Sequence, residues 1–186
     1  LLRVPPRRVR AFLRRYGPLA ERAETDKALR AELEGEGYVF ASETDTEVVA
    51  HLLEKYYDGD LKRTVMRTAS RLEGSYVLGV LCADEPGRLF CVKEAGPLIL
   101  GLGVGENYFA SDVTALVSRT KNVIYMDDGE FAELTPEHIT VFDRTGREIT
   151  KTVSHVVWDI EAAEKGGYDH FMMKEIMEQP RAVKST

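Results

Sequence analysis

The sequence predicts an α+β fold in which helices and strands are segregated along the chain. Helical patterns dominate up to residue 72, and about seven short strand-like runs follow from residue 75. Tight connections rich in Gly, Pro and Asp separate these runs, and such connections favour antiparallel hairpins over the long helical crossovers of a parallel sheet. We therefore expect antiparallel sheets covered by helices rather than a doubly wound α/β fold.

The early helices are defined by their periodicity and by signals at their ends. Thr44 and Glu47 match a capping box, in which the Thr44 hydroxyl accepts from the Glu47 N–H and the Glu47 side chain reaches back. Glycines follow the first helical run, as they commonly do at helix ends. The predicted helices cover residues 27–34, 44–58 and 61–72, and a short strand-like run lies at 38–41.

From residue 74 the pattern becomes strand-like, with β-branched and aromatic residues between turn residues. Asp112 is expected to cap a short helix that runs to Val117. Helices are also predicted over residues 161–165 and 171–179, the last one ended by Pro180. The predicted strands cover residues 75–83, 88–93, 98–102, 107–110, 123–126, 130–134, 139–142 and 148–153.

Composition indicates one globular domain and excludes several classes of protein. The chain has 186 residues, of which 44% are hydrophobic and 30% charged. No apolar run approaches the roughly 20 residues that cross a bilayer, so we expect no membrane association. The net charge of −6 argues against nucleic acid as a partner. Two cysteines do not make a disulfide framework, and we expect a cytoplasmic protein with free thiols.

The first residues differ in charge from the rest of the chain. Residues 1–20 contain six arginines and no acid, so the other residues together carry −12. An Arg-rich start can mark a transit peptide, but this stretch has no Ser or Thr. The remaining interpretations are a disordered arm and a misread or shifted coding region. We predict an atypical basic N-terminal arm over residues 1–26.

Two features that could carry chemistry have structural explanations. The Gly101–Gly105 run is followed by a strand pattern rather than a helix, so it indicates a hairpin and not a phosphate-binding loop. Cys82 and Cys91 lie on neighbouring predicted strands. They are directly opposite if the turn is only Pro86-Gly87, whereas Cys82 faces Leu89 in the longer loop that we favour. Either way, both thiols are expected to be small core residues.

The ionisable residues give one candidate binding group. Glu47 and His51 are one helical turn apart, but no third ligand has suitable spacing, so we predict a surface pair and no metal site. The other histidines are expected to be structural. Asp45 either stabilises the first turn of a helix or faces a cleft, where its carboxylate would pair with a ligand ammonium group.

Several stretches resemble, in order, the glutaminase (class II glutamine amidotransferase) domains of the glutamine–fructose-6-phosphate aminotransferase (isomerizing) family. The similarity begins near Ala28 and continues to the end of the chain. Its Gly-Gly-Tyr and Glu-Gln-Pro tail favours this family over amidotransferases of asparagine or purine synthesis. The matching stretches are residues 42–51, 74–76, 96–98, 101–112, 158–168 and 164–180.

The resemblance implies an N-terminal-nucleophile hydrolase fold, a four-layer α/β/β/α sandwich truncated here at its N-terminal side. Residues 27–168 would form a partial glutaminase domain, and residues 169–186 a linker helix towards an absent sugar isomerase domain. In the family, an N-terminal cysteine attacks glutamine while an Asn side chain and a Gly N–H hold the oxyanion. This chain has Leu1 at its start and no matching Asn-Gly pair, so no catalytic residue carries over.

Asp45 is the one site residue that the resemblance assigns, because it matches the aspartate that binds the α-amino group of glutamine. Glutamine is the expected ligand, with no cofactor and no metal. We expect a glutamine amidotransferase domain of the enzyme that forms glucosamine 6-phosphate from fructose 6-phosphate, inactive as this chain. The alternative is a non-catalytic amino-acid-binding or dimerisation module, for which exposed sheet edges would favour a homo-oligomer.

Overall fold

The fold was analysed in a computed structural model. It describes the backbone of residues 2–3, 9–16, 19–42, 44, 46–157 and 171–184 and the side chains of residues 27–42, 44, 46–157 and 172–179. Within these residues, no helix combines the length and the apolar character needed to cross a membrane.

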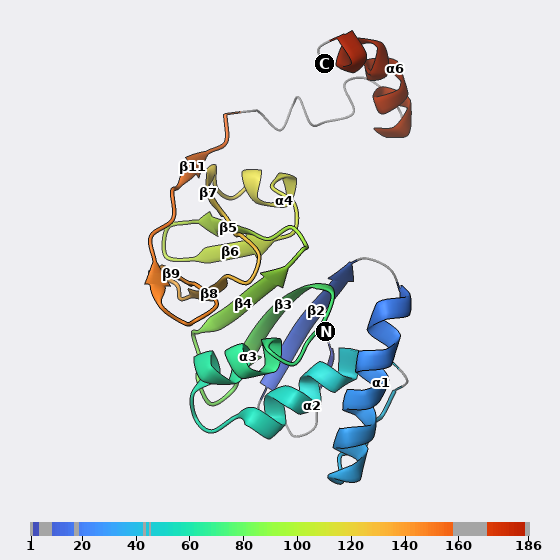
Figure 1. Cartoon of the computed structure of the whole chain (residues 1–186). Coiled ribbons are helices and arrows are strands. Elements are labelled where there is room, and N and C mark those ends of the chain that lie inside the picture. The colour runs from blue at the N-terminus through green and yellow to red at the C-terminus, as the bar shows by residue number, and fades with distance from the viewer. Residues whose placement is uncertain are drawn as a thin grey trace.

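Two antiparallel sheets form the centre of the molecule (Figure 1). The larger has seven strands in the order β1-β2-β3-β4-β8-β9-β10, and the smaller has four in the order β11-β7-β5-β6. The larger sheet contains β1 (Leu2–Arg3), β2 (Val9–Tyr16), β3 (Ser75–Cys82), β4 (Leu89–Glu94), β8 (Phe131–Leu134), β9 (Ile139–Phe142) and β10 (Glu148–Ile149). The smaller contains β5 (Ile99–Leu102), β6 (Asn107–Ala110), β7 (Asn122–Tyr125) and β11 (Ser154–His155).

Helices cover the outer face of each sheet and give four layers. Helices α1 (Leu19–Gly35), α2 (Thr46–Tyr56) and α3 (Leu61–Ala69) pack on the larger sheet through an apolar cluster that includes Leu33, Leu53, Val65 and Phe90. Helix α4 (Thr114–Val117) covers the smaller sheet. A further cluster lies between the two sheets. The α+β class and the α/β/β/α order of layers are therefore confirmed.

Strands β3 and β4 are buried on both faces, because one face meets the helices and the other meets the smaller sheet. Leu78 and Val80 belong to the cluster under the helices, whereas Val77 belongs to the cluster between the sheets. This double burial explains why residues 76–80 are apolar at nearly every position instead of alternating with polar residues.

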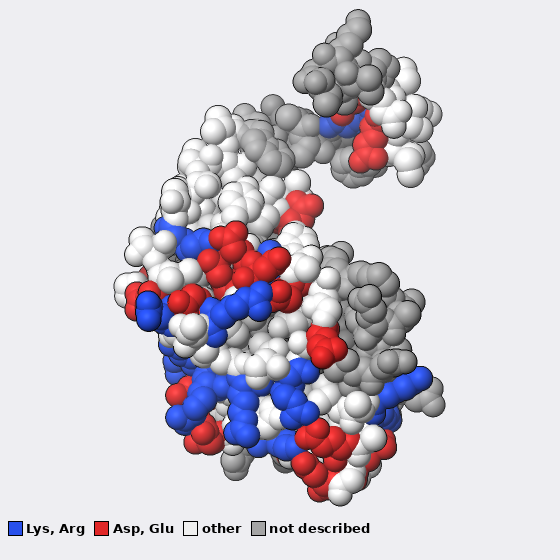
Figure 2. Space-filling model, in the orientation of Figure 1, with Lys and Arg blue, Asp and Glu red and all other residues white. Residues whose placement is uncertain are grey.

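Ion pairs link the helices at the surface. Glu32 of α1 contacts Lys55 of α2 at 2.8 Å and Arg71, just after α3, at 2.7 Å. The hydrogen bonds from Arg71 and Lys55 lower the pKa of Glu32 to about 2. Figure 2 shows that basic and acidic side chains lie beside one another on this face of the molecule.

The N-terminal segment differs from the predicted arm. Within residues 1–26, Val9–Tyr16 forms β2, which pairs with β3 over eight residue pairs, and α1 begins at Leu19 instead of Lys27. The backbone ladder needs N–H and C=O groups in register and does not depend on the charge of the side chains, which explains how an Arg-rich segment enters a sheet.

Three other elements were predicted wrongly. Residues 38–41, predicted as a strand, form a coil that ends in a bend, and residues 150–153 are outside the strands. Helix α6 (Phe171–Lys184) continues through Pro180. Proline removes one N–H donor but has a helical φ, so the other backbone bonds can continue the helix. The helix predicted over residues 161–165 lies outside the described residues.

The register of β3 and β4 places the two cysteines differently from both predicted alternatives. Gly79 is opposite Cys91 and Leu81 is opposite Leu89, so the loop is longer by one residue than the one we favoured. Cys82 therefore faces the helices and Cys91 faces the smaller sheet. Both thiols are free and buried, as predicted. Burial raises the pKa of Cys91 to about 12.

The glycine-rich run forms the predicted hairpin. Strands β5 and β6 pair from Ile99 with Ala110 to Leu102 with Asn107, and no helix follows the glycines directly. A Cβ at Gly103 would lie 2.4 Å from the backbone oxygen of Glu106. Such an overlap involves backbone and cannot be relieved by a side-chain rotation, so the turn requires glycine at this position.

We predict that Gly103→Ala lowers the free energy of unfolding by about 1–3 kcal/mol, the usual cost of forcing extra atoms into a packed region. Urea unfolding followed by circular dichroism measures the change. Gly35→Ala is the control, because no atom lies within 4 Å of a Cβ added there. Equal stability of the Gly103 variant and the wild-type chain would contradict the steric argument.

Candidate functional site

The segment from Ser42 to His51 joins a coil to the first turns of α2 and contains the predicted binding residue. Glu47 lies in the first turn of the helix and is only 7% exposed. Its carboxylate accepts hydrogen bonds from the N–H groups of Ala41 and Ser42, each at 2.8 Å, and from the Ser42 hydroxyl at 2.6 Å. The carboxylate therefore ties the preceding coil to the helix.

These contacts differ from the predicted capping box. Glu47 does reach back, but to Ala41 and Ser42 rather than to the N–H of Thr44. The Glu47 N–H donates to the backbone oxygen of Thr44 at 3.3 Å, and the Thr44 hydroxyl instead contacts the Ser42 hydroxyl at 2.7 Å. The coil folds closely over the helix start and offers the carboxylate two N–H donors next to one another.

His51 is buried behind Glu47, so the prediction of a surface pair was wrong. The side chain is 2% exposed and lies between two carboxylates, with 3.7 Å from Nε2 to Glu47 Oε1 and 3.9 Å from Nδ1 to Glu54 Oε2. The ring of Phe40 packs against it edge-on at 4.5 Å between centroids, and Tyr38 does so at 5.3 Å. Helix periodicity correctly predicted that Glu47 and His51 lie one turn apart, but it could not predict that Tyr38 and Phe40 cover the histidine.

Burial shifts the ionisation of this cluster. It lowers the pKa of His51, although the charge of Glu47 acts in the opposite direction. Burial also raises the pKa of Glu54. Burial alone would raise the pKa of Glu47, but the hydrogen bonds from Ser42 and Ala41 outweigh it and the pKa is lowered. At neutral pH the cluster therefore combines a charged Glu47 with a neutral imidazole.

Asp45, the predicted substrate-binding residue, lies outside the described residues, as do Trp158 and His170. Its neighbours Thr44 and Thr46 are described, and Thr46 begins α2. His155 is exposed and contacts Asn122 at 2.9 Å, and His138 is exposed in the turn after β8. Within the described part of the chain, no group of three or more His, Cys, Asp and Glu residues could hold a metal ion.

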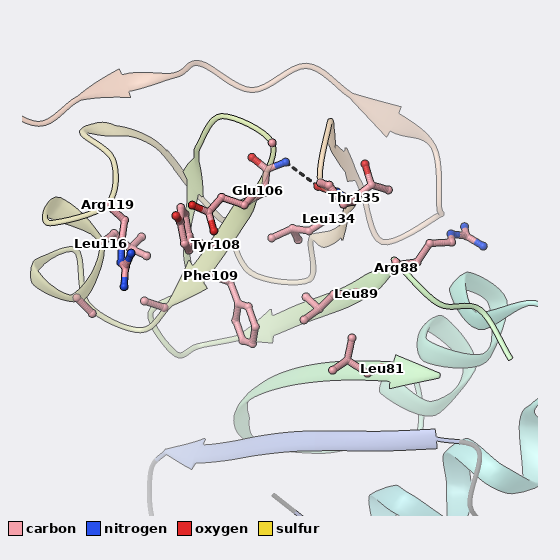
Figure 3. A pocket seen from close by; sticks show the side chains of 16 residues that line it. Leu81, Arg88, Leu89, Glu106, Tyr108, Phe109, Leu116, Arg119, Leu134 and Thr135 are labelled. Carbon is pink, nitrogen blue, oxygen red and sulfur yellow. Dashed lines mark hydrogen bonds between the residues drawn. The ribbon is translucent and has the colours of Figure 1, made fainter. Parts of the chain in front are cut away.

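A second feature, which the sequence analysis missed, is a cavity of about 600 Å³ at the edge of the smaller sheet (Figure 3). Leu81, Leu89 and Leu134 line it from the larger sheet, and Phe109 lines it from β6. The leucines are direct partners across β3, β4 and β8. Only the register of these strands brings the three together, and the sequence does not show that register.

The family follows from comparison with known proteins. Residues 23–118 match the model of the glutamine amidotransferase domain. This range contains both cysteines, the β5–β6 hairpin, and Glu47 with its hydrogen-bond donors Ala41 and Ser42, which together we call the Glu47 clamp. The chain belongs to the glutamine amidotransferase domain family. The resemblance predicted from the motifs is thus confirmed.

Curated relatives of this amidotransferase domain are much longer proteins. This chain is 49% identical over 158 residues to a glutamine–fructose-6-phosphate aminotransferase (isomerizing) from Clostridium tetani. The match covers 85% of this chain and 26% of the relative. The corresponding enzyme from Caldanaerobacter subterraneus is 52% identical over 151 residues, with 81% and 25% covered. The chain thus spans about a quarter of the length of the curated relatives it matches.

Solved structures of low sequence identity share the fold. The glutamine phosphoribosylpyrophosphate amidotransferase of B. subtilis, in complex with ADP and GMP, superposes with a TM-score of 0.58 at 22% identity, over 73% of this chain and 28% of that one. An allosteric regulatory enzyme of purine biosynthesis gives a TM-score of 0.57 at 21% identity, over 76% and 30%. These likenesses support the N-terminal-nucleophile hydrolase fold.

We predict that Glu47→Gln destabilises the domain at neutral pH by about 1–3 kcal/mol, because an amide has one acceptor oxygen and would turn an NH₂ group towards backbone N–H donors. Urea unfolding measures the loss. Glu34→Gln is the control, since the Glu34 carboxylate is exposed and, among the residues whose side chains are described, its ion pair is with Arg30 on the same helix. Losses of equal size in the two variants would show that the clamp has no special role.

We also predict that the stability of the domain depends on pH because of His51. The charged groups that face His51 are Glu47 and Glu54 of the same helix and Arg30 of α1. Unfolded histidine titrates near about pH 6.5, and burial lowers the pKa in the folded state. Below about pH 6.5 the unfolded chain therefore binds more protons, and the free energy of unfolding falls as the pH drops towards the folded pKa.

Urea unfolding at about pH 7.5 and about pH 5.5 tests this prediction. His51→Leu should lose less stability than the wild-type chain between the two pH values. His138→Leu, which removes an exposed histidine, should behave like the wild-type chain. An unchanged pH dependence in His51→Leu would rule out His51 as its source.

Proposed function

We propose that this chain is the glutamine amidotransferase domain of an enzyme that forms glucosamine 6-phosphate from fructose 6-phosphate and glutamine. The family match over residues 23–118 carries the proposal, and the names of the relatives that are about half identical support the sugar phosphate as the acceptor. The relatives' additional length would supply the site where the sugar reacts.

Asp45 is the residue that we assign to glutamine binding, through its carboxylate and the α-ammonium group of the amino acid. It lies two residues before Glu47, whose hydrogen bonds hold the preceding coil against α2. The start of a helix carries a partial positive charge, which keeps an aspartate ionised and able to pair with a cation.

The positions of the two cysteines support the absence of glutaminase activity in this chain alone. Hydrolysis of glutamine in this family requires a thiolate nucleophile beside a base and a cradle for the oxyanion. Cys82 and Cys91 are both buried inside the sandwich, and the pKa of Cys91 is raised to about 12. Burial keeps both sulfur atoms away from a glutamine side chain, and the raised pKa also makes Cys91 a poor nucleophile.

The C-terminal helix supports a connection to a further domain. Met172, Met173, Ile176 and Met177 of α6 are each at least half exposed. Apolar side chains grouped at helical spacing usually pack against another surface. We assign residues 169–186 to a linker helix towards the sugar isomerase domain.

Isothermal titration of the purified chain with glutamine tests the binding site. We expect weak binding of glutamine, and we expect Asp45→Ala to lower the affinity about tenfold or more. Removal of the carboxylate leaves the ammonium group of glutamine without its counter-ion. Glu137→Ala removes an exposed carboxylate elsewhere and should leave the affinity unchanged.

The same preparations should release no glutamate from glutamine above the level seen with Asp45→Ala. Absence of glutamine binding by the wild-type chain would contradict the assigned ligand. Release of glutamate by the wild-type chain at a higher rate than by Asp45→Ala would contradict the proposed inactivity while supporting the role of Asp45.

A further inference from the structure

The coil that precedes α2 is held by two different helices, and both of them bind Ser42. From α2, the Glu47 carboxylate accepts hydrogen bonds from the Ser42 N–H at 2.8 Å and from its hydroxyl at 2.6 Å. From α1, Arg30 Nη1 donates to the carbonyl oxygen of Ser42 at 3.0 Å. The N–H, hydroxyl and carbonyl groups of Ser42 therefore each have a partner on a neighbouring helix.

Arg30 is also fixed by packing, and its contacts close a cycle around the coil. Its guanidinium lies over the ring of Phe40, 4.3 Å from the centroid. Phe40 packs edge-on against His51 at 4.5 Å between centroids, and His51 Nε2 lies 3.7 Å from the Glu47 carboxylate. The cycle runs from Arg30 through Ser42, Glu47, His51 and Phe40 back to Arg30, so each member is held from two sides.

These contacts go beyond what the start of a helix requires. A helix start needs acceptors for its own first N–H groups, which a residue just before the helix commonly supplies. Here Glu47 and Arg30 bind backbone groups of the coil outside α2, and Arg30 loses the rotamer freedom of a long side chain in doing so. What the contacts achieve is a fixed backbone at Ser42.

The fixed backbone continues through the residues that flank Asp45 in the sequence. The Ser42 hydroxyl contacts the Thr44 hydroxyl at 2.7 Å and accepts from the Thr44 N–H at 3.3 Å. On the other side, Thr46 is the first residue of α2. The chain is thus held before Asp45 by the contacts of Ser42 and after it by the helix.

We propose that Arg30 and Ser42 are positioning residues for glutamine, which hold the coil before Asp45 so that its carboxylate is ready for the α-ammonium group. This inference rests on the proposed function, which assigns Asp45 to the ligand. Arg30 and Ser42 act through the backbone and do not touch glutamine. The apparent affinity of a site falls with the fraction of molecules in the binding conformation, and supporting contacts raise that fraction.

Isothermal titration of the full chain with glutamine tests both residues. Ser42→Ala and Arg30→Met should each lower the affinity about fivefold, the population shift that loss of one hydrogen bond produces. Ser42→Thr keeps the hydroxyl and should restore most of the affinity. Ser70→Ala and Arg63→Met are the matched controls, because they remove an exposed serine and an exposed arginine at α3 and should bind like the wild-type chain.

A comparison with Gly103→Ala separates positioning from a general loss of stability. That substitution acts at the β5–β6 turn, so it should lower the melting temperature and leave the affinity for glutamine unchanged. Ser42→Ala and Arg30→Met should lower the affinity even where circular dichroism shows that they melt no earlier than Gly103→Ala. If one of the two does not fold, the other is used alone.

Hydrogen exchange without glutamine provides a readout that does not need the ligand. In Ser42→Ala and Arg30→Met, the amides of residues 41–46 should exchange about fivefold faster than in the wild-type chain, since local opening becomes more frequent. The amides of α3 should exchange at the wild-type rate. Faster exchange over the whole chain would instead indicate global destabilisation and would contradict a positioning role.

The outcomes distinguish this inference from the proposed function. If the wild-type chain binds glutamine and Asp45→Ala weakens binding, unchanged affinity in both Ser42→Ala and Arg30→Met overturns the inference and leaves the proposed function intact. Unchanged exchange of residues 41–46 in both variants overturns it as well. Absence of glutamine binding by the wild-type chain contradicts the proposed function and, with it, a positioning role for glutamine.

Discussion

Burial of the β3–β4 ladder on both faces is the constraint on which the rest of this structure depends. A strand pair with apolar side chains on each face needs two covering layers, and the chain supplies them as the three N-terminal helices on one side and the smaller sheet on the other. Gly79 lets the two sheets pack closely, because its lack of a side chain leaves room for the ring of Phe109 from the smaller sheet. The spacing of the layers at β6 follows from that contact.

At the start of α2, burial involves two ionisable side chains, Glu47 and His51, instead of apolar ones. A carboxylate and an imidazole that are both almost fully buried carry a large desolvation cost unless their charges are compensated. Glu47 meets this cost with two N–H donors and one hydroxyl, and His51 meets it by remaining neutral. The consequence is a fixed connection between the coil at Ala41 and Ser42 and a helix that packs on the central sheet. A binding residue in this segment would be positioned by packing on both sides.

Local patterns in the sequence predicted the hairpins well, because strand alternation and turn residues act over a few positions. Ile139–Phe142 and Asn107–Ala110 were predicted with their observed bounds. The register of β3 and β4 was wrong by one residue, since it depends on the path of the loop between them. The burial of His51 was missed because Tyr38 and Phe40 reach it from a coil, and helix periodicity contains no information on such contacts. Strand β2 was missed because its arginines obscure the apolar alternation typical of a strand. The segment is held in the sheet by backbone hydrogen bonds to β3, which the local sequence does not indicate.

The two features with functional potential lie on opposite faces of the larger sheet. The Glu47 clamp belongs to the helix layer, whereas the cavity lined by Leu81, Leu89 and Phe109 lies between the sheets. Strand β3 separates them, with Leu78 and Val80 packed under the helices and the neighbouring Leu81 exposed at the cavity. Because successive residues of a strand face opposite sides, a molecule bound in this cavity against Leu81 would make no direct contact with the helix layer. Any coupling between the cavity and the Glu47 clamp must therefore pass through a movement of β3 itself, and packing on both faces restricts such a movement.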